Sequence, residues 1–525
     1  MHRTIVIGLD GANWPMIQPW IDEGILPHLR TLQETGCWGK CTSCLPVITC
    51  PNWKCYSTGK NPGKLGVYRW DRIDTQNRQF ILHDASSFKS REMWDYMNDA
   101  GLKAGIINMP TTYPPKPVKG FMISGGPDAS EGEFRSNVNI NYVSPPALRT
   151  YVEEKFGYRV HPEPMINSKN ASEATIEAIL KLTEMRFDVG RDLAEREEVD
   201  FLHITCFYSQ ALQHFFWRGE PVRRVWQLID RKIGEFVGGG NTLVLMSDHG
   251  CTKVKTNFFI NVWLQKNGYL RVKRTVDDVL HGVGITRERM LKVSNALGVT
   301  SLLAQIVPQR LQKMIPWQEG MRKSRIFEKV VWDKTKAIAN TLGPIYINLD
   351  PQSSEYESLR QDLIDKLEDV RCPTDNGKVF EKVYRREEIY DGPYVDVAPD
   401  LVAIHVDGIH VSDSIGKEDY FDEEGAWEAD NTLKGLFLFH GPEVRRGEML
   451  HDCSILDLAP TILHMMGIPI PDDMDGRVMD VFRPGSISSE REVVYQASRH
   501  AGDADSRKKE DEEVAQRLRS LGYLD

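Results

Sequence analysis

An aspartate and a histidine stand side by side where an apolar run ends. The run covers residues 241–247, and Asp248 and His249 follow it. A second apolar run, Thr4–Leu9, is followed by Asp10. Carboxylate and imidazole groups are good ligands for a borderline metal such as zinc. Because open α/β folds place their chemistry at the carboxyl ends of parallel strands, these side chains predict one metal site at a sheet edge.

Short β-branched runs alternate with helical patterns along the chain. This alternation predicts an α/β fold with a mostly parallel central sheet and helices on both faces. The predicted strands are residues 4–9, 105–108, 121–124, 201–206, 242–247, 401–404 and 436–439. The predicted helices are residues 90–100, 171–195, 220–234, 356–368 and 455–466.

One region interrupts this alternation. Residues 257–328 have a helical pattern, are basic and are rich in Leu, Val and Arg. We expect them to form an insertion that caps the metal site. The catalytic core then consists of residues 1–256 and 329–484. Residues 485–525 are expected to form a charged C-terminal extension, in which the amphipathic pattern of 512–521 predicts a short helix.

Composition limits the partners and the location of the protein. The chain has 525 residues, of which 41% are apolar and 27% charged, as is typical of a globular enzyme. Its net charge of −10 argues against binding to nucleic acid or anionic membranes through bulk charge. The sequence shows no membrane-spanning apolar run and no secretory signal, so we expect a cytoplasmic protein. Nine cysteines, an odd number, fit a reducing compartment better than a disulfide framework.

Several motifs occur in a recognisable order. The segments are residues 8–11, 45–53, 57–63, 108–115, 247–250, 457–461 and 474–476. With these motifs the chain resembles the alkaline phosphatase superfamily, in particular its type I phosphodiesterase/nucleotide pyrophosphatase branch. The resemblance extends from residue 4 to about residue 483, and several ordered motifs support it better than any single one. It implies an alkaline-phosphatase-like three-layer sandwich with a mostly parallel sheet, carrying a helical cap insertion.

The resemblance also implies a threonine nucleophile, which is Thr49 in this sequence. A threonine hydroxyl is a weak nucleophile at neutral pH unless a cation holds it deprotonated. Asp10, Asp248 and His249 are the implied ligands of that cation, with Thr49 as a further ligand or near-ligand. Zinc is the expected metal, and manganese and magnesium are alternatives. Asn52 is expected to donate a hydrogen bond to a nonbridging oxygen of the ester.

The sequence departs from the resemblance at a second metal position, which phosphoester hydrolases of the superfamily usually fill. His214 matches one metal ligand, but Gln210 replaces an aspartate and Asn431 replaces a histidine. Leu65 stands at a further position where a histidine is possible. Because one imidazole and two neutral amides form a poor zinc site, we expect one ion in the site. Gln210 and Asn431 are expected to bind a substrate oxygen instead.

Other interpretations of these residues stay open. A rearranged ligand set drawn from Asp430, His440 and His451 would restore a second metal. The Cys-x3-Cys-x2-Cys spacing at residues 37–44 is that of an iron–sulfur motif, but its position before the nucleophile segment favours coincidence.

Together with the metal-site residues, the resemblance implies a metal-dependent enzyme acting on small phosphate, phosphodiester or sulfate esters, including nucleotide-like ones. Hydrolysis through a covalent intermediate and transfer of the group to an alcohol or amine are both compatible with the pattern. The alternative is a catalytically silent family member that binds a ligand or a protein. The lost second-metal ligands favour that alternative, whereas the retained Thr49 opposes it.

Overall fold

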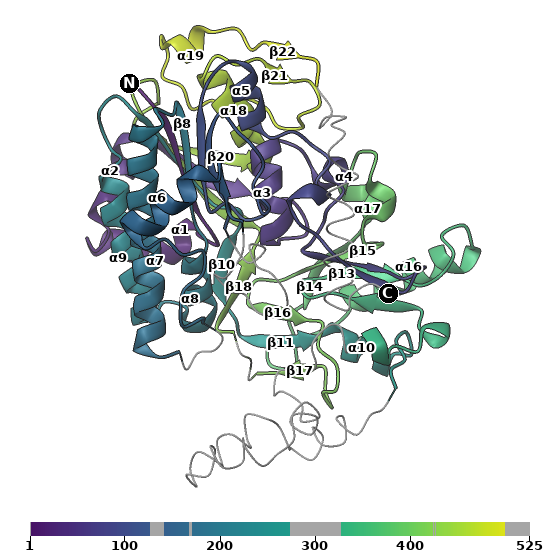
Figure 1. Ribbon diagram of the computed structural model, residues 1–525. Helices are drawn as coiled ribbons and strands as arrows, with labels where there is room; N and C mark the ends of the chain where they lie inside the picture. The colour runs from purple at the N-terminus through teal and green to yellow at the C-terminus, as the bar shows by residue number, and fades with distance from the viewer. Residues whose placement is uncertain are drawn as a thin grey trace.

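The computed structural model describes residues 2–125, 141–166, 171–273, 327–423, 425 and 427–498. Across these residues the chain forms a large central sheet and a smaller, mainly antiparallel lobe (Figure 1). In spatial order the nine described strands of the central sheet are β20 (Glu448–Ser454), β2 (Cys37–Thr42), β19 (Lys434–His440), β9 (Thr242–Met246), β1 (Thr4–Leu9), β8 (Phe201–Cys206), β5 (Ala104–Ile107), β6 (Gly120–Ile123) and β7 (Val143–Ser144).

The middle of the central sheet is parallel. β1 is hydrogen-bonded to β8 on one side and to β9 on the other, and all three run in the same direction. The parallel arrangement continues through β5 and β6. β19 runs antiparallel to β9 and to β2, and β7 runs antiparallel to β6. The predicted α/β class with a mostly parallel sheet is confirmed.

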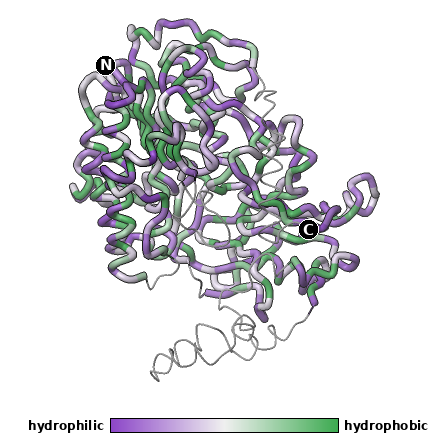
Figure 2. Tube along the Cα trace, in the orientation of Figure 1, coloured by the Kyte–Doolittle hydropathy of each residue, from purple (hydrophilic) through white to green (hydrophobic). Residues whose placement is uncertain are grey.

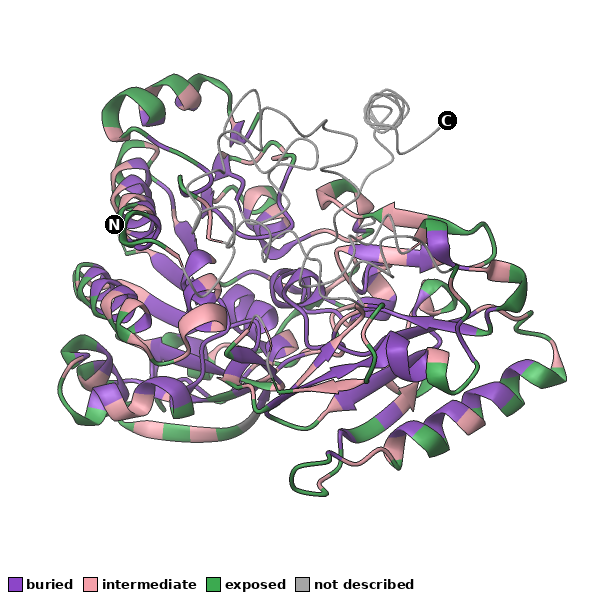
Figure 3. Ribbon diagram, turned by 90° about the horizontal axis from the view of Figure 1, so that it is seen from below, coloured by how far each residue is buried: buried purple, intermediate pink, exposed green. Residues whose placement is uncertain are grey.

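Helices cover both faces of this sheet, which makes three layers. One face packs against α1 (Trp14–Asp22), α2 (Pro27–Thr35), α6 (Ala147–Phe156), α7 (Glu173–Arg196), α8 (Tyr208–Phe216) and α9 (Glu220–Gly234). The other packs against α3 (Thr49–Thr58), α4 (Pro62–Leu65), α5 (Met93–Asp99) and α18 (Leu458–Met465). Figure 3 shows buried residues on the inner sides of these layers.

Strand β1 is apolar throughout because it is covered on both faces. Ile5 and Ile7 belong to the core under the first set of helices, whereas Val6 belongs to the core under the second. Successive side chains of a strand point to opposite faces, so a strand covered on both sides needs apolar residues at every position. The hydrophobic residues are accordingly concentrated in the central strands (Figure 2).

The smaller lobe has its own core. Its four-stranded antiparallel sheet runs in the order β12 (Ala337–Ala339), β13 (Pro344–Ile347), β15 (Leu401–His405) and β14 (Phe380–Arg385). A three-stranded sheet of β16 (Ile409–Ser412), β11 (Thr256–Phe259) and β17 (Phe421–Asp422) adjoins it. The helices α16 (Ser354–Glu368) and α10 (Ile260–Lys266) contribute apolar side chains to the same core.

This lobe changes two expectations. The predicted strand 401–404 lies in the antiparallel sheet and not in the central one, because an apolar run indicates a buried strand without indicating its sheet. The first residues of the expected helical insertion 257–328 are the end of a strand, β11, followed by α10, and both are part of the lobe's core. Residues 274–326 lie outside the described residues, so the cap stays a prediction.

The remaining elements are short. They are the hairpin β3 (Asp71–Asp74) and β4 (Gln79–Leu82), the ribbon β10 (Gly250–Lys253) and β18 (Ala429–Thr432), the pair β21 (Ile470–Pro471) and β22 (Tyr495–Gln496), the helices α17 (Arg386–Ile389) and α19 (Ile487–Glu490), and the 3-10 turns at Ala85–Ser87, Trp332–Lys334, Val395–Val397 and Ile455–Asp457. The helix predicted at 512–521 falls outside the described residues. Among the described helices, none has both the length and the apolar character required to cross a membrane.

Candidate metal centre

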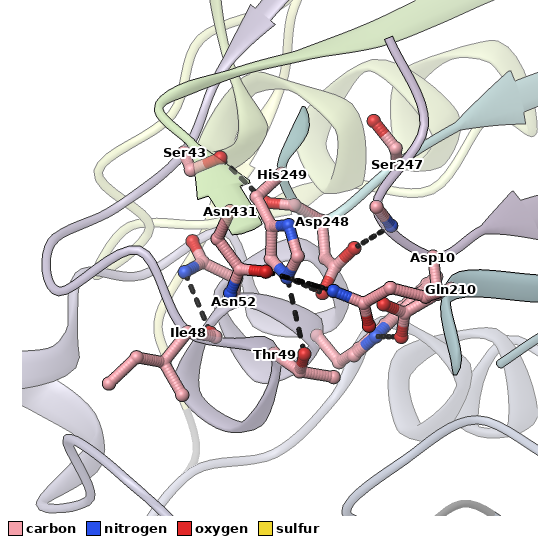
Figure 4. Close-up of polar contacts among 12 residues, drawn as sticks. Asp10, Ser43, Ile48, Thr49, Asn52, Gln210, Ser247, Asp248, His249 and Asn431 are labelled. Atoms are coloured by element: carbon pink, nitrogen blue, oxygen red, sulfur yellow. Dashed lines mark hydrogen bonds and ion pairs between the residues drawn. The ribbon is translucent and has the colours of Figure 1, made fainter. Parts of the chain in front are cut away.

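The register of two neighbouring strands brings two aspartates together. β1 and β9 pair in parallel with Gly8 opposite Met246, and the same register continued by two residues places Asp10 opposite Asp248. His249 follows directly. The ligand atoms of Asp10, Asp248 and His249 all lie within 4.8 Å of one another, and the three side chains are fully buried (Figure 4).

Each carboxylate has one oxygen fixed by the protein and one left over. Trp53 Nε1 donates to Asp10 Oδ2 at 3.0 Å. The Gly11 amide donates to Asp248 Oδ1 at 3.2 Å. Within the described residues, Asp10 Oδ1 and Asp248 Oδ2 have no hydrogen-bond donor. Buried carboxylate oxygens without a donor are costly, and a bound cation would compensate them.

Electrostatics favours the same conclusion. Burial raises the pKa of Asp10 well above its usual range, and the negative charge of Asp248 raises it further. Burial likewise raises the pKa of Asp248, although the neighbouring His249 counteracts the shift. Two carboxylates in a dry site repel each other unless a positive charge lies between them. The residues present therefore fit a divalent cation.

His249 is oriented for ligation. Its Nδ1 lies 2.9 Å from the carbonyl oxygen of Gly250, which can only accept, so Nδ1 carries the proton in this arrangement. The unprotonated Nε2 then faces the site, 3.2 Å from Asp248 Oδ2 and 3.2 Å from Thr49 Oγ1. A hydrogen bond that fixes one ring nitrogen in this way commonly orients the other towards a metal.

The nucleophile candidate Thr49 is the first residue of α3. Its hydroxyl lies 3.2 Å from His249 Nε2, and the side chain is almost fully buried. The start of a helix carries a partial positive charge, which favours a negatively charged oxygen at this position. The structure thus places Thr49 beside the three predicted metal ligands, as the sequence led us to expect.

The Asn52 side chain forms hydrogen bonds within its own loop. Its Nδ2 donates to the carbonyl oxygens of Ile48 at 2.9 Å, Cys44 at 3.1 Å and Pro46 at 3.2 Å. Its Oδ1 accepts from the Cys44 amide at 2.7 Å, and the side chain has no exposed surface. The amide therefore ties the loop before α3 to its first turn. Its expected contact with an ester oxygen stays a prediction.

The degenerate second metal position contains a hydrogen-bonded amide pair. Gln210 Nε2 donates to Asn431 Oδ1 at 2.9 Å and lies 3.4 Å from His249 Nε2. Asn431 Nδ2 donates to the Val47 carbonyl at 3.0 Å. The structure therefore brings Gln210 and Asn431 to the edge of the metal centre (Figure 4).

His214 lies on the same helix as Gln210, four residues further along, and contacts the strand that carries Asn431. Its Nδ1 donates to the Ala429 carbonyl at 2.8 Å, and its ring stacks on Trp427 with centroids 4.0 Å apart. Burial lowers the pKa of His214 to about 4, so the imidazole is neutral at physiological pH. Within the described residues, the acids and histidines whose ligand atoms lie close enough to share an ion do not include His214. Its expected role as a metal ligand stays a prediction, because its neighbours at the second position are the amides Gln210 and Asn431 and not acids or histidines.

The alternative second ligand set does not assemble. Asp430 lies in β18, and its Oδ2 is 2.7 Å from His410 Nδ1, within hydrogen-bonding distance. His440 ends β19 opposite Leu243, near the start of β9, and His451 lies in β20. Across the described ranges, the one group of three or more acids, histidines or cysteines with close ligand atoms is the first centre.

Two further sequence observations have structural outcomes. Leu65, which stands at a possible histidine position, is fully buried in the core on the α3 side of the sheet. The cysteines of residues 37–44 belong partly to strand β2, and their thiols form no metal-binding group within the described part of the chain. The interpretation of their spacing as coincidence is therefore consistent with the structure.

Comparison with known proteins places this centre in a family. The sequence profile of the type I phosphodiesterase/nucleotide pyrophosphatase family matches residues 4–432. The chain belongs to this family. It is therefore a phosphoester hydrolase of the phosphodiesterase/pyrophosphatase type within the alkaline phosphatase superfamily, and the predicted resemblance is confirmed. A search of curated proteins gives no match.

Two solved structures of other proteins have a similar architecture. Phosphonoacetate hydrolase from Sinorhizobium meliloti, in complex with phosphonoformate, superposes with a TM-score of 0.54 at 14% identity, over 87% of this chain and 94% of that chain. Murine ectonucleotide pyrophosphatase/phosphodiesterase 5 gives a TM-score of 0.50 at 13% identity, over 92% of this chain and 100% of that chain. These likenesses confirm the predicted alkaline-phosphatase-like fold.

The paired carboxylates make the stability of the protein depend on pH. In the metal-free protein the pKa values of Asp10 and Asp248 are raised, so the folded state keeps protons bound at pH values where the unfolded chain has released them. This contribution to stability is complete below the unfolded carboxyl pKa of about 4 and is lost as the pH rises through the higher folded values.

Asp10→Asn should therefore raise the melting temperature of the metal-free protein at about pH 8, because it removes a buried charge and its repulsion of Asp248. The gain should shrink as the pH falls towards about 4, because the raised pKa values of both carboxyls favour their neutral forms at low pH. Thermal unfolding in excess chelator at several pH values measures both effects. A variant no more stable than the parent at high pH would contradict the assigned repulsion.

Proposed function

We propose that this family member is a one-metal phosphoester hydrolase or phosphotransferase that acts through Thr49. The observation that carries the proposal is the position of the Thr49 hydroxyl, which is buried and lies 3.2 Å from His249 Nε2. Asp10 and Asp248 lie close to His249, and each has a carboxylate oxygen with no donor from the described residues. An intact nucleophile beside an intact ligand set supports an enzyme over a silent binding protein.

A divalent cation bound by these residues, zinc in our proposal, would keep the Thr49 hydroxyl deprotonated at neutral pH. Thr49 Oγ1 then forms a bond to phosphorus, and the ester bond to the leaving oxygen breaks. The leaving oxygen takes up a proton from solvent. Water, or another alcohol or amine, next attacks the phosphorus and releases Thr49. Thr49 leaves as the alkoxide that the cation would hold, and the proton of the attacking water, alcohol or amine passes to solvent, which balances the proton taken up in the first step.

The amides at the second metal position take part by hydrogen bonding. Gln210 has two amide hydrogens and uses one on Asn431 Oδ1. Asn431 likewise uses one hydrogen on the Val47 carbonyl. The remaining hydrogens can be donated to an oxygen of the substrate. Neutral donors stabilise developing charge less than a second cation does, so we expect substrates with good leaving groups to react fastest.

Small phosphate-containing molecules are the proposed substrates. The phosphonoacetate hydrolase structure contains phosphonoformate, and an inactive variant of murine ectonucleotide pyrophosphatase/phosphodiesterase 5 is in complex with AMP at a TM-score of 0.50 and 12% identity. Those ligands belong to those proteins. They support testing phosphodiesters and nucleotides first, with phosphate monoesters and sulfate esters as comparison classes.

The test combines metal content, turnover and trapping of the intermediate. Purified protein loaded with zinc is assayed with aryl phosphodiesters, aryl phosphates and aryl sulfates, with and without an added acceptor alcohol. Mass spectrometry of rapidly quenched samples then locates a phosphoryl group on the peptide that contains Thr49. Turnover with a modified Thr49 supports the proposal. Absence of both metal and turnover would favour the silent binding protein.

The degenerate position also allows a gain of function. Gln210→Asp combined with Asn431→His restores an aspartate and a histidine beside His214 and should raise the metal content from about one to about two ions per chain, because charged and imidazole ligands hold zinc better than amides. Metal analysis after dialysis measures the change, and each single substitution serves as a control. Unchanged metal content would show that the empty position lies elsewhere.

A further inference from the structure

A tryptophan on the nucleophile helix contacts a metal ligand. Trp53 lies on α3, and its indole Nε1 donates to Asp10 Oδ2 at 3.0 Å. The whole side chain is buried. Thr49 and Trp53 are four residues apart on the same helix, so they lie on one face of it. One helical turn therefore carries both the proposed nucleophile and a donor to the metal site.

The indole ring is held in place by its surroundings. Gly8 of β1 makes room for it, because a Cβ at that position would lie 2.5 Å from the Trp53 ring. The rings of Tyr56 and His203 meet the indole edge-on, with centroids 6.1 Å and 5.9 Å away. A ring packed on these sides has no space to change rotamer without moving β1 or α3.

The polar groups behind the ring are themselves satisfied. His203 Nδ1 lies 3.1 Å from the Tyr56 hydroxyl, and His203 Nε2 lies 2.7 Å from Thr205 Oγ1. Burial lowers the pKa of His203 to about 3, so the imidazole that contacts the indole is neutral at physiological pH. Tyr56, His203 and Thr205 thus form hydrogen bonds with one another, and the indole N–H donates to Asp10.

We infer that Trp53 is a positioning residue for the metal centre. Its N–H holds Asp10 Oδ2, and this leaves Oδ1, which has no donor from the described residues, for the ion that Asp248 and His249 would share. The same contact fixes the distance between the strand that carries Asp10 and the helix that carries Thr49. This inference rests on the proposed metal site and adds a determinant of its affinity. Hydrogen bonds that orient a ligand commonly change metal affinity about 10–100-fold.

The sharpest test removes only the N–H. Site-specific replacement of Trp53 by benzothienylalanine keeps the size and shape of the side chain but puts sulfur in place of the donor nitrogen. Trp94 offers a matched control, because it is equally buried in the same core and its Nε1 has no hydrogen-bond partner in the described structure. Zinc affinity is measured by chelator competition, and stability by thermal unfolding of the metal-free protein.

We expect the analogue at Trp53 to weaken zinc binding by about 10–100-fold and the analogue at Trp94 to leave it unchanged. Trp53→Phe should weaken zinc at least as much, and its loss of stability in the metal-free state should resemble that of Trp94→Phe. Equal zinc affinities for the two analogues would overturn the inference while leaving the metal site intact. If the parent protein binds no zinc, manganese or magnesium, the proposed function itself fails.

Discussion

Thr49→Ala should lower turnover of every accepted ester by roughly 10³-fold or more, as the removal of a nucleophile does in other covalent enzymes. The residual rate would come from the remaining groups acting directly on water. Zinc affinity should change much less than turnover, because Asp10, Asp248 and His249 remain and supply the three close ligand atoms. A variant that loses activity but keeps its metal would separate the nucleophile from the ligand set.

Two controls make this prediction specific. Thr49→Ser retains a hydroxyl at the start of α3 and should recover part of the activity, whereas Thr49→Val retains the shape without the hydroxyl and should not. Quenched reactions of Thr49→Ala should contain no phosphorylated peptide from this segment. Turnover equal to that of the parent protein in Thr49→Ala would refute the assignment of the nucleophile.

The parts of the fold that the sequence predicts best are those with one possible environment. β1, β8 and α9 have the predicted boundaries, because the strands are apolar throughout and the helix has one apolar face. The predicted strand 401–404 belongs to a different sheet from the expected one, since a short apolar run fits any buried strand. Long-range pairing is decided by contacts that no local pattern records.

The same distinction holds within the metal centre. Asp10, Asp248 and His249 were predictable because strand ends in a parallel sheet meet at one edge, and the structure brings them together. The contact between Trp53 and Asp10 was not predicted, although Trp53 is part of the nucleophile motif, because a tryptophan in a buried helix is expected to be a core residue. The small residue Gly8 opposite the indole is a signal only when the pairing of α3 with β1 is known.

Asn52 illustrates the opposite case. A motif match predicted a contact with substrate, whereas the structure gives its amide three carbonyl partners and one amide partner in the surrounding loop. The loop before α3 needs those hydrogen bonds, because its carbonyl groups are buried before the helix begins. A side chain that satisfies buried backbone groups and one that binds substrate look alike in sequence.

His249→Ala should remove metal binding and turnover together, because the His249 imidazole contacts both a proposed metal ligand, Asp248, and the proposed nucleophile, Thr49. Nε2 lies 3.2 Å from Asp248 Oδ2 and 3.2 Å from Thr49 Oγ1. Without it the two buried aspartates are the remaining strong ligands, and their mutual repulsion opposes ionisation. We expect a loss of zinc affinity greater than the roughly 10–100-fold that follows the loss of an orienting partner.

Added imidazole distinguishes a missing ligand from a damaged fold. The side chain of His249 is fully buried, so its removal leaves a cavity shaped for an imidazole ring. Free imidazole should therefore restore part of the zinc binding and turnover of His249→Ala. His464 of α18 provides the control, because it is also buried and its Nε2 donates to the carbonyl of Ser488 in α19 at 2.8 Å. His464→Ala should keep its metal and gain nothing from imidazole, and tight zinc binding by His249→Ala without imidazole would remove His249 from the ligand set.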